Sequence, residues 1–186
     1  MKSYTVRELM VSLSEYAGVS EDATLYEAVK ALEAAQKKFR ESPYKHRGIL
    51  VYDKNNKVIG KLGQLDVLKA LEPKYYEMQD HAGMRAYGFS RQFMKSMMDK
   101  FHLLDGAMVN ICKKAGQTQV SHFVVKPTEG EFVDMDAPMD EAIHQLVMGQ
   151  HQSLLVTDKS GDIVGILRLT DLFTTICNTM HECGID

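Results

Sequence analysis

The sequence predicts an α+β protein made of two copies of one unit. Two observations carry this prediction: a stretch that begins at Asp22 reappears at Asp136, and each is followed by two short apolar runs separated by a polar turn. The chain has 186 residues and is 45% hydrophobic and 25% charged, which is typical of a compact globular protein. Units of roughly 60 residues are marginally stable alone, so we expect the copies to pack together.

Three matching segments define the repeat. They are residues 22–32 with 136–146, 49–54 with 154–159, and 58–66 with 163–171. The first pair is offset by 114 residues and the other two by 105, so the first copy carries nine extra residues between its helix and its next strand. Self-similarity at a nearly constant offset is a stronger indication of architecture than any single short motif.

A helix is predicted near the start of each copy. Apolar residues recur there at helical spacing: Leu25, Ala28, Val29 and Leu32 in the first copy, and Met139, Ala142, Ile143, Leu146 and Val147 in the second. Thr24 and Glu27 have the spacing of a capping box, in which each side chain bonds the backbone near the other. Pro138, which has no amide hydrogen, marks the start of the second helix.

Two buried strands and another helix follow in each copy. The short apolar runs cover residues 49–52 and 58–62, and then 154–157 and 163–167. Residues 53–56 and 158–161 separate the members of each pair with turn-forming side chains. Helical periodicity resumes at residues 65–71 and 169–176. Each copy is therefore predicted to run helix, strand, turn, strand, helix.

The segment between the copies is predicted to be a helical insert. Half of the chain's 12 methionines lie between Met78 and Met108. The run 91–104 places large apolar residues at helical spacing: Phe93, Met94, Met97, Met98, Phe101 and Leu104. Two interpretations are open. This face packs on its own module or on a second subunit, or it is a Met-rich surface for a partner protein.

These residues resemble the cystathionine-β-synthase (CBS) domain, a β-α-β-β-α module that occurs in pairs called Bateman modules. Three features carry the resemblance: the Thr/Pro-x-x-Glu-Ala helix opening, a strand that ends in hydrophobic-Val-x-Asp, and a glycine-containing strand that runs into an Asp-hydrophobic pair. Residues 164–172 match the last pattern closely and residues 59–67 more loosely. The two matching stretches cover about residues 5–71 and 119–178.

The resemblance implies a pseudo-twofold pair of CBS domains with ligand clefts between the copies. We divide the chain into a first CBS domain at 1–72, the helical insert at 73–118, and a second CBS domain with a short tail at 119–186. Adenine nucleotides or related adenosyl compounds are the implied ligands: AMP, ADP, ATP or S-adenosylmethionine. No permanent cofactor is expected. Because paired CBS modules commonly dimerise, we expect a homodimer helped by the insert.

The resemblance also implies site residues. In nucleotide-binding members an Asp at the start of the last helix holds the ribose hydroxyls, which places this role on Asp66 and Asp171; alternatively, each carboxylate merely complements its helix dipole. The Ser or Thr that contacts phosphate three residues earlier is replaced by Gly63 and Arg168. Gly63 permits close backbone approach. Arg168 contacts phosphate, fills the cleft itself, or pairs with a neighbouring carboxylate.

Further candidates lie beside these positions. Thr170 either caps the last helix or reaches the ligand. In the family the start of the strand at residue 49 lines the cleft, which makes Arg47 a candidate phosphate contact and His46 a candidate for stacking or hydrogen bonding. In the second copy the counterpart of His46 is His151, and the candidates beside it are Gln152, Ser153 and Leu154.

Composition and motifs argue against several classes of function. The net charge of −3 gives no reason to expect nucleic acid, and no apolar run is long enough for a membrane helix or a secretory leader. Phosphate-loop, zinc-protease and nucleophile-elbow motifs are absent from the sequence, so no enzyme is expected. Three cysteines without a close pair favour the reducing cytoplasm.

The leading hypothesis is a stand-alone regulatory module that binds an adenine nucleotide and modulates a partner or its own assembly. The alternative is an interaction or scaffold protein with empty clefts. The retained Asp66 and Asp171 favour the first, and the replaced Ser/Thr positions favour the second. A third hypothesis is thiol- or metal-dependent regulation through Cys177, His181 and Cys183.

Overall fold

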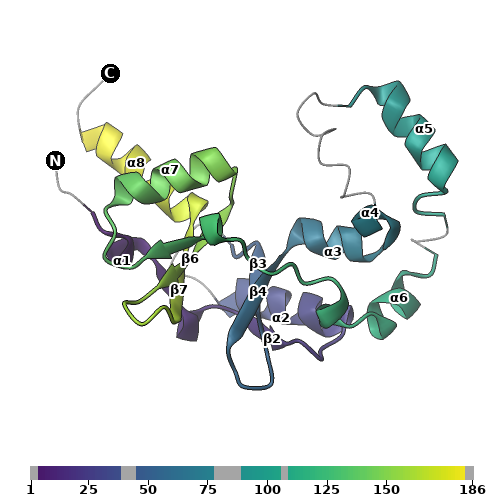
Figure 1. The fold of residues 1–186 in the computed structure, drawn as a ribbon, viewed down its shortest axis with the longest axis horizontal. Coiled ribbons are helices and arrows are strands. Elements are labelled where there is room, and N and C mark those ends of the chain that lie inside the picture. Colours follow the sequence, from purple (N-terminus) through teal and green to yellow (C-terminus); the bar gives the residue numbers. More distant parts are fainter. Residues whose placement is uncertain (1–3, 39–44, 78–88, 106–108, 183–186) are drawn as a thin grey trace.

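The computed structural model describes residues 4–38, 45–77, 89–105 and 109–182, and it is an α+β fold with two sheets (Figure 1). The first copy contains β2 (Gly18–Ser20), α2 (Leu25–Lys38), β3 (Gly48–Tyr52), β4 (Val58–Gly63) and α3 (Gln64–Ala70). The second contains β5 (Phe132–Asp134), α7 (Met139–Gly149), β6 (Ser153–Thr157), β7 (Ile163–Arg168) and α8 (Leu169–Glu182). Both copies have the β-α-β-β-α order that the resemblance implies.

The elements predicted from hydrophobic spacing are confirmed. The strand pairs β3/β4 and β6/β7 begin and end within one residue of the predicted runs, and α8 continues to Glu182 rather than stopping at residue 176. The residue pattern did not predict β2 and β5. Each spans three residues, which is too short for an alternating pattern to be recognised.

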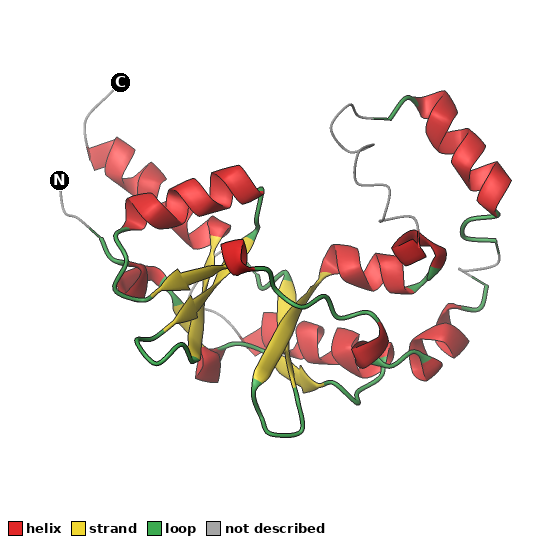
Figure 2. Cartoon of the chain, in the orientation of Figure 1, coloured by secondary structure: helices red, strands yellow, loops and turns green. Residues whose placement is uncertain are grey.

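The two sheets share one topology (Figure 2). In each, the first strand runs parallel to the second, and the second pairs antiparallel with the third, giving β2-β3-β4 and β5-β6-β7. The pairing of Leu50 with Lys61 is repeated by Leu155 with Ile166 at the 105-residue offset. The sequence repeat is therefore preserved in the strand register.

Turn and cap residues act as predicted. In the capping box of α2, the Thr24 N–H donates to Glu27 Oε2 at 2.7 Å, and the Glu27 N–H donates to Thr24 Oγ1 at 3.3 Å. Pro138 is the N-cap of α7. Asp53 and Asp158 each accept two backbone N–H groups of their own hairpin turn. These carboxylates fix the two hairpins in the same way.

Each core is completed by a segment that precedes the other copy. Helix α1 (Val6–Leu9) packs on the second copy, where Val6 is fully buried in a cluster that includes Val133 and Leu167. The short 3-10 turn at Val120–His122 packs on the first copy, where Val120 is fully buried in a cluster with Leu25. Neither core is closed by its own β-α-β-β-α unit alone.

We call this packing of each leading segment on the opposite copy the exchange. Equivalent backbone hydrogen bonds hold the two leading segments in place. The Val6 N–H donates to Ala137 O at 3.1 Å, and the Val120 N–H donates to Ala23 O at 2.8 Å. Both donors and both acceptors are related by the 114-residue offset. The repeat therefore extends to the leading segments, where Val6 and Val120 occupy equivalent positions.

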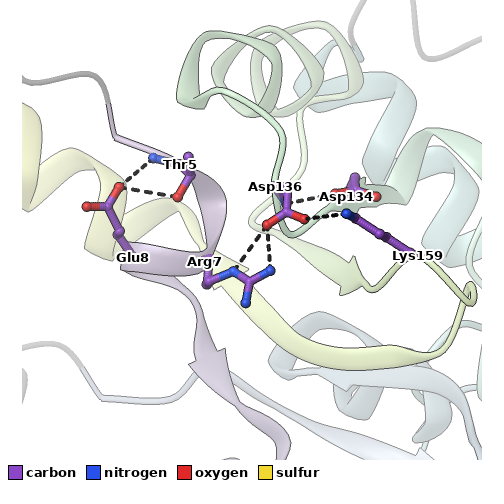
Figure 3. A network of polar contacts seen from close by, with 6 residues as sticks. All are labelled: Thr5, Arg7, Glu8, Asp134, Asp136 and Lys159. Atoms are coloured by element: carbon purple, nitrogen blue, oxygen red, sulfur yellow. Dashed lines mark hydrogen bonds and ion pairs between the residues drawn. The ribbon is translucent and has the colours of Figure 1, made fainter.

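Polar contacts add to the attachment of α1 (Figure 3). Arg7 Nε and Nη2 donate to Asp136 Oδ1 at 3.2 and 2.5 Å, and the Asp136 N–H donates to Asp134 Oδ1 at 2.7 Å. The Arg7 and Asp136 side chains are 54% and 43% exposed, so this ion pair stabilises the fold by at most about 1 kcal/mol. Burial of Val6 is the larger contribution.

A glycine in β7 and one in β4 allow a segment from outside each β-α-β-β-α unit to lie close to these strands. Strand β1 (Val11–Ser12) pairs antiparallel with β7, and a β-carbon on Gly165 would lie 2.7 Å from Val11 O. On the first copy, Val125 forms an isolated bridge with Lys61, and a β-carbon on Gly60 would lie 2.9 Å from Val125 O. The motif glycine therefore has a steric role in both copies.

The two sheets meet through a small core of their own. It contains Leu50, Leu155 and Ile166, all essentially fully buried. Lys61, at the position equivalent to Ile166, makes a polar contact between the copies instead: its Nζ lies 2.9 Å from Glu131 Oε2 and donates to Ser153 O at 2.8 Å. An apolar contact and a polar contact thus lie at equivalent positions where the two sheets meet.

The described part of the insert is helical, as predicted. It contains α4 (Lys74–Glu77), α5 (Arg91–Phe101) and α6 (Ile111–Gln117). Helix α6 packs on the first copy, where Ile111 and Ala115 border the core. In Figure 1, α5 lies at the periphery of the molecule. Within the described residues, no helix is long and apolar enough to cross a membrane.

The apolar face of α5 stays partly exposed among the described residues. Its exposed side chains are Phe93, Met94, Met98 and Phe101, and Leu104 follows the end of the helix. Polar contacts hold the end of the helix: the Leu104 N–H donates to buried Glu72 at 2.8 Å, and Lys74 Nζ donates to Phe101 O at 2.9 Å. These five side chains are therefore only partly covered by the described residues, whereas Met97 is half-buried.

Replacing Gly165 with Ala is expected to lower the free energy of unfolding by about 1–3 kcal/mol, because the added methyl group displaces the Val11 backbone from β7. Gly116→Ala in α6 is the matched control. Nothing lies within 4 Å of its added β-carbon, and Ala is the better helix former, so stability should hold or rise slightly. Urea unfolding measures both. Unchanged stability of Gly165→Ala would contradict the close approach of the Val11 backbone to β7.

Candidate functional site

The two candidate ribose-binding carboxylates occupy equivalent places in the fold. Asp66 lies in the first turn of α3 and Asp171 in the first turn of α8. Each helix starts beside the hairpin's first strand: the Gln64 N–H donates to Arg47 O at 3.1 Å, and the Leu169 N–H donates to Gln152 O at 3.0 Å. The backbone therefore brings together the predicted site positions of each copy.

In the second copy, Arg168 and Asp171 form a buried ion pair. Arg168 Nε donates to Asp171 Oδ2 and Nη2 donates to Oδ1, both at 2.5 Å. The two side chains are 6% and 15% exposed. Of the three roles left open for Arg168, the structure shows the ion pair, and its partner is the candidate ribose-binding residue itself.

His46 of the first copy reaches this ion pair. Its Nδ1 lies 3.3 Å from Arg168 Nη1, and its ring packs edge-on against Tyr16 with the ring centroids 4.5 Å apart. The His46 side chain is fully buried. Gln36 Nε2 donates to the His46 carbonyl at 2.6 Å and fixes the backbone there. The cluster thus joins side chains from both copies.

Burial and charge keep the aromatic members of the cluster neutral. The pKa of His46 is lowered from 6.5 to about 4, chiefly by burial and also by the charge of Arg168, while Asp171 partly opposes these effects. Burial also raises the pKa of Tyr16 to about 12. A neutral imidazole can accept the Arg168 hydrogen bond at Nδ1, whereas an imidazolium cannot. The charges present at neutral pH are therefore those of Arg168 and Asp171.

The equivalent place in the first copy carries no such ion pair. Asp66 Oδ2 accepts the Gly63 N–H at 2.9 Å, and its Oδ1 lies 3.7 Å from Lys69 Nζ. A β-carbon on Gly63 would meet Asp66 Oδ2 at 3.4 Å, an ordinary contact distance. Arg47 is exposed at the start of β3. Asp66 therefore accepts the amide of the N-cap residue of α3, and its side chain is 26% exposed, against 15% for Asp171.

The other candidates of the second copy take varied positions. Leu154 is fully buried in the second core, and Gln152 is exposed. Ser153 accepts hydrogen bonds from Lys61 at its carbonyl and its hydroxyl, at 2.8 and 3.4 Å. The Thr170 carbonyl accepts the Thr174 hydroxyl at 2.8 Å inside α8. The structure gathers Arg168, Asp171 and His46 and leaves these four outside that cluster.

Sequence reasoning missed Tyr16 and Lys61. Lys61 carried a usable signal, because it interrupts a buried apolar run at the position where the second copy has Ile166. The contact with Lys61 also affects the pKa of its partner, Glu131. Burial alone would raise the pKa of Glu131, but the hydrogen bonds from Lys61 and the Thr128 amide hold it below the usual value. Tyr16 lies outside the matching segments and carried no signal.

The thiol or metal hypothesis gains no support from the described residues. Among them, no three His, Cys, Asp or Glu side chains are placed to hold a metal ion. Cys177 is a half-buried free thiol, and Cys183 lies outside the described residues.

The comparisons with known proteins agree with this fold. The CBS domain profile matches residues 6–73 and 118–178. The chain belongs to the CBS domain family. Among curated protein sequences, none matches this CBS pair significantly.

Solved structures of CBS proteins share the fold. The CBS-pair protein CBSX2 from Arabidopsis thaliana is 14% identical, with a TM-score of 0.62 over 97% of this chain and 99% of that one. A structure of CBSX2 in complex with AMP is 18% identical, with a TM-score of 0.58 over 95% and 98%. A CBS domain-containing protein of unknown function from Bacillus anthracis is 14% identical, with a TM-score of 0.60 over 94% of both chains.

The lowered pKa of His46 predicts a loss of stability in mild acid. Between pH 6.5 and about 4, the unfolded chain takes up a proton at His46 that the folded protein does not. Unfolding is therefore favoured as the pH falls, by about 2 kcal/mol at pH 5 relative to pH 7.5. Urea unfolding across this range measures the effect.

His46→Asn is the control, because an Asn carbonyl can accept the Arg168 hydrogen bond near the Nδ1 position but does not titrate. Its stability should change less between pH 7.5 and 5. Equal pH dependence in wild type and His46→Asn would contradict a neutral buried His46.

Proposed function

We propose that this CBS pair is a regulatory module that binds an adenine nucleotide between its copies and thereby modulates a partner protein or its own assembly. The observation that carries the proposal is the repeated placement of a carboxylate, Asp66 and Asp171, in the first turn of the last helix of each copy. Both lie beside the start of the hairpin's first strand. We assign the protein a regulatory rather than a catalytic role and place it in the cytoplasm.

The chemistry of these positions suits a nucleotide. A carboxylate can accept hydrogen bonds from both hydroxyls of a ribose, and a cation beside it attracts phosphate. In the first copy, Asp66 and the exposed Arg47 supply these groups, and Gly63 leaves room beside the carboxylate. In the second copy, Asp171 and Arg168 supply them. The AMP complex of a CBS protein with the same fold supports AMP as the first ligand to test.

Thermal unfolding with AMP, ADP, ATP and S-adenosylmethionine tests this proposal. A ligand at 100 times its dissociation constant should stabilise the folded protein by about 2.7 kcal/mol. Asp66→Asn and Asp171→Asn should each reduce the shift, because an amide accepts fewer hydrogen bonds from a diol than a carboxylate does. Asp140→Asn, at an exposed acidic residue in the first turn of α7, is the matched control and should keep the full shift.

The absence of a shift with all four compounds at millimolar concentration would overturn nucleotide binding. A shift that neither Asp66→Asn nor Asp171→Asn changes would place the ligand elsewhere. These two conclusions apply to variants that unfold cooperatively in the absence of ligand.

One observation favours a ligand-free scaffold as the second candidate function. Asp171 already holds Arg168, and neither copy has the hydroxyl side chain at the phosphate position. In that case the protein would act through contacts between its surface and other protein molecules. The exposed face of α5 is then the relevant surface.

We propose that the α5 face joins two copies of the chain into a homodimer. Exposed apolar clusters of this kind mark interaction surfaces, and Phe89 stacks on Phe93 at the start of the face. Met98→Glu should convert a dimer into a monomer, because it places a charge in the apolar contact. Gln92→Glu adds the same charge at another exposed α5 position and should remain dimeric. Light scattering over a concentration series decides, and a monomeric wild type would refute the dimer.

A further inference from the structure

Three side chains of the protein fill the space beside Asp171, and we call them the Tyr16–His46–Arg168 cluster. Arg168 donates to both carboxylate oxygens of Asp171 at 2.5 Å, and its Nη1 lies 3.3 Å from His46 Nδ1. The ring centroids of Tyr16 and His46 are 4.5 Å apart. His46 and Arg168 are buried. The candidate position of the second copy is therefore occupied by the protein itself.

The repeat relates each member of this cluster to a residue beside Asp66. The hairpins pair in the same register at the 105-residue offset, and the short first strands do so at the 114-residue offset. The equivalent pairs are Tyr16 with Gly130, His46 with His151, and Arg168 with Gly63. Two of the three cluster positions thus have no side chain in the other copy.

The third equivalent, His151, places its ring elsewhere. A β-carbon on Gly149 would lie 2.1 Å from His151 Nε2, so the ring lies directly against the Gly149 backbone. Ala35 stands at the position equivalent to Gly149, and its β-carbon excludes a ring from that place in the first copy. The His46 ring packs on Tyr16 instead. The two histidines therefore differ in where their rings lie.

The two glycines leave room beside Asp66. A β-carbon on Gly130 would meet no atom within 4 Å, and one on Gly63 would meet Asp66 Oδ2 at the ordinary contact distance of 3.4 Å. The Asp66 side chain is 26% exposed, against 15% for Asp171. We call the place beside Asp66 that these two residues border the glycine position.

The glycine position lies where the two copies meet. Gly63 ends β4 of the first copy, and Gly130 lies in the 3-10 turn before β5 of the second. Lys61, two residues before Gly63, has its Nζ 2.9 Å from Oε2 of Glu131, which follows Gly130. This ion pair holds the two segments together. A ligand at the glycine position therefore contacts both copies, as the proposed function requires.

We propose that the glycine position is the tighter nucleotide site of the chain, and that the Tyr16–His46–Arg168 cluster is a built-in occupant of its second-copy counterpart. This inference rests on the proposed function. A ligand at Asp171 must displace side chains of the protein and disturb a buried ion pair, which is costly to break. The difference follows from the side chains at equivalent positions and not from the number of partners of either carboxylate.

Calorimetric titration of the full chain with AMP, ADP, ATP and S-adenosylmethionine tests the proposal. The compound that binds best should occupy one tight site per chain, and any second site should be at least about tenfold weaker because a buried ion pair opposes it. Gly63→Arg places beside Asp66 the side chain that stands beside Asp171, and it should weaken the tight site at least about tenfold. Gly130→Tyr supplies the equivalent of Tyr16 and should act in the same direction if Gly63→Arg fails to fold.

The matched control is Gly116→Arg, which adds the same charge to exposed helix α6, where nothing lies within 4 Å of the new β-carbon. It should leave the tight site unchanged. Two wild-type sites of equal affinity, or full affinity in both Gly63→Arg and Gly130→Tyr, would overturn this inference and leave the proposed function standing. Equal weakening by Gly116→Arg and Gly63→Arg would overturn it as well. If none of the four compounds binds the wild type, both fail.

Discussion

Each copy of the repeat depends on a segment that precedes the other copy. Val6 closes the second core and Val120 closes the first, and equivalent backbone hydrogen bonds hold both segments in place. A unit of about 60 residues is only marginally stable alone. Because each core includes a segment that precedes the other copy, the two units stabilise each other. Gly60 and Gly165 allow the leading segments to lie close to the sheets, because a side chain at either position would collide with the backbone of Val125 or Val11.

The same exchange places two equivalent sets of positions in one molecule, and single residues make them unequal. At one pair of equivalent positions, Ile166 packs between the sheets while Lys61 forms an ion pair with Glu131. At another pair, Arg168 forms an ion pair with Asp171, whereas Gly63 has no side chain beside Asp66. The backbone symmetry thus creates the positions, and these substitutions determine their charge.

The sequence predicted most of the secondary structure because long elements carry a periodic apolar pattern and the repeat confirmed each one twice. It did not predict β2 or β5, which are too short to show a period. It also did not predict the exchange, because the leading segments lie outside the three matching segments of the repeat. For the site, the positions of Asp66 and Asp171 followed from motif spacing. The contact of His46 with Arg168 did not, because it joins residues 122 apart in the sequence through the packing of the two copies.

The most direct test of the account is a crystal structure of the wild-type protein grown with AMP. We expect AMP to lie between the two copies, with its ribose hydroxyls on Asp66 or on Asp171. AMP bound at neither carboxylate would contradict the account.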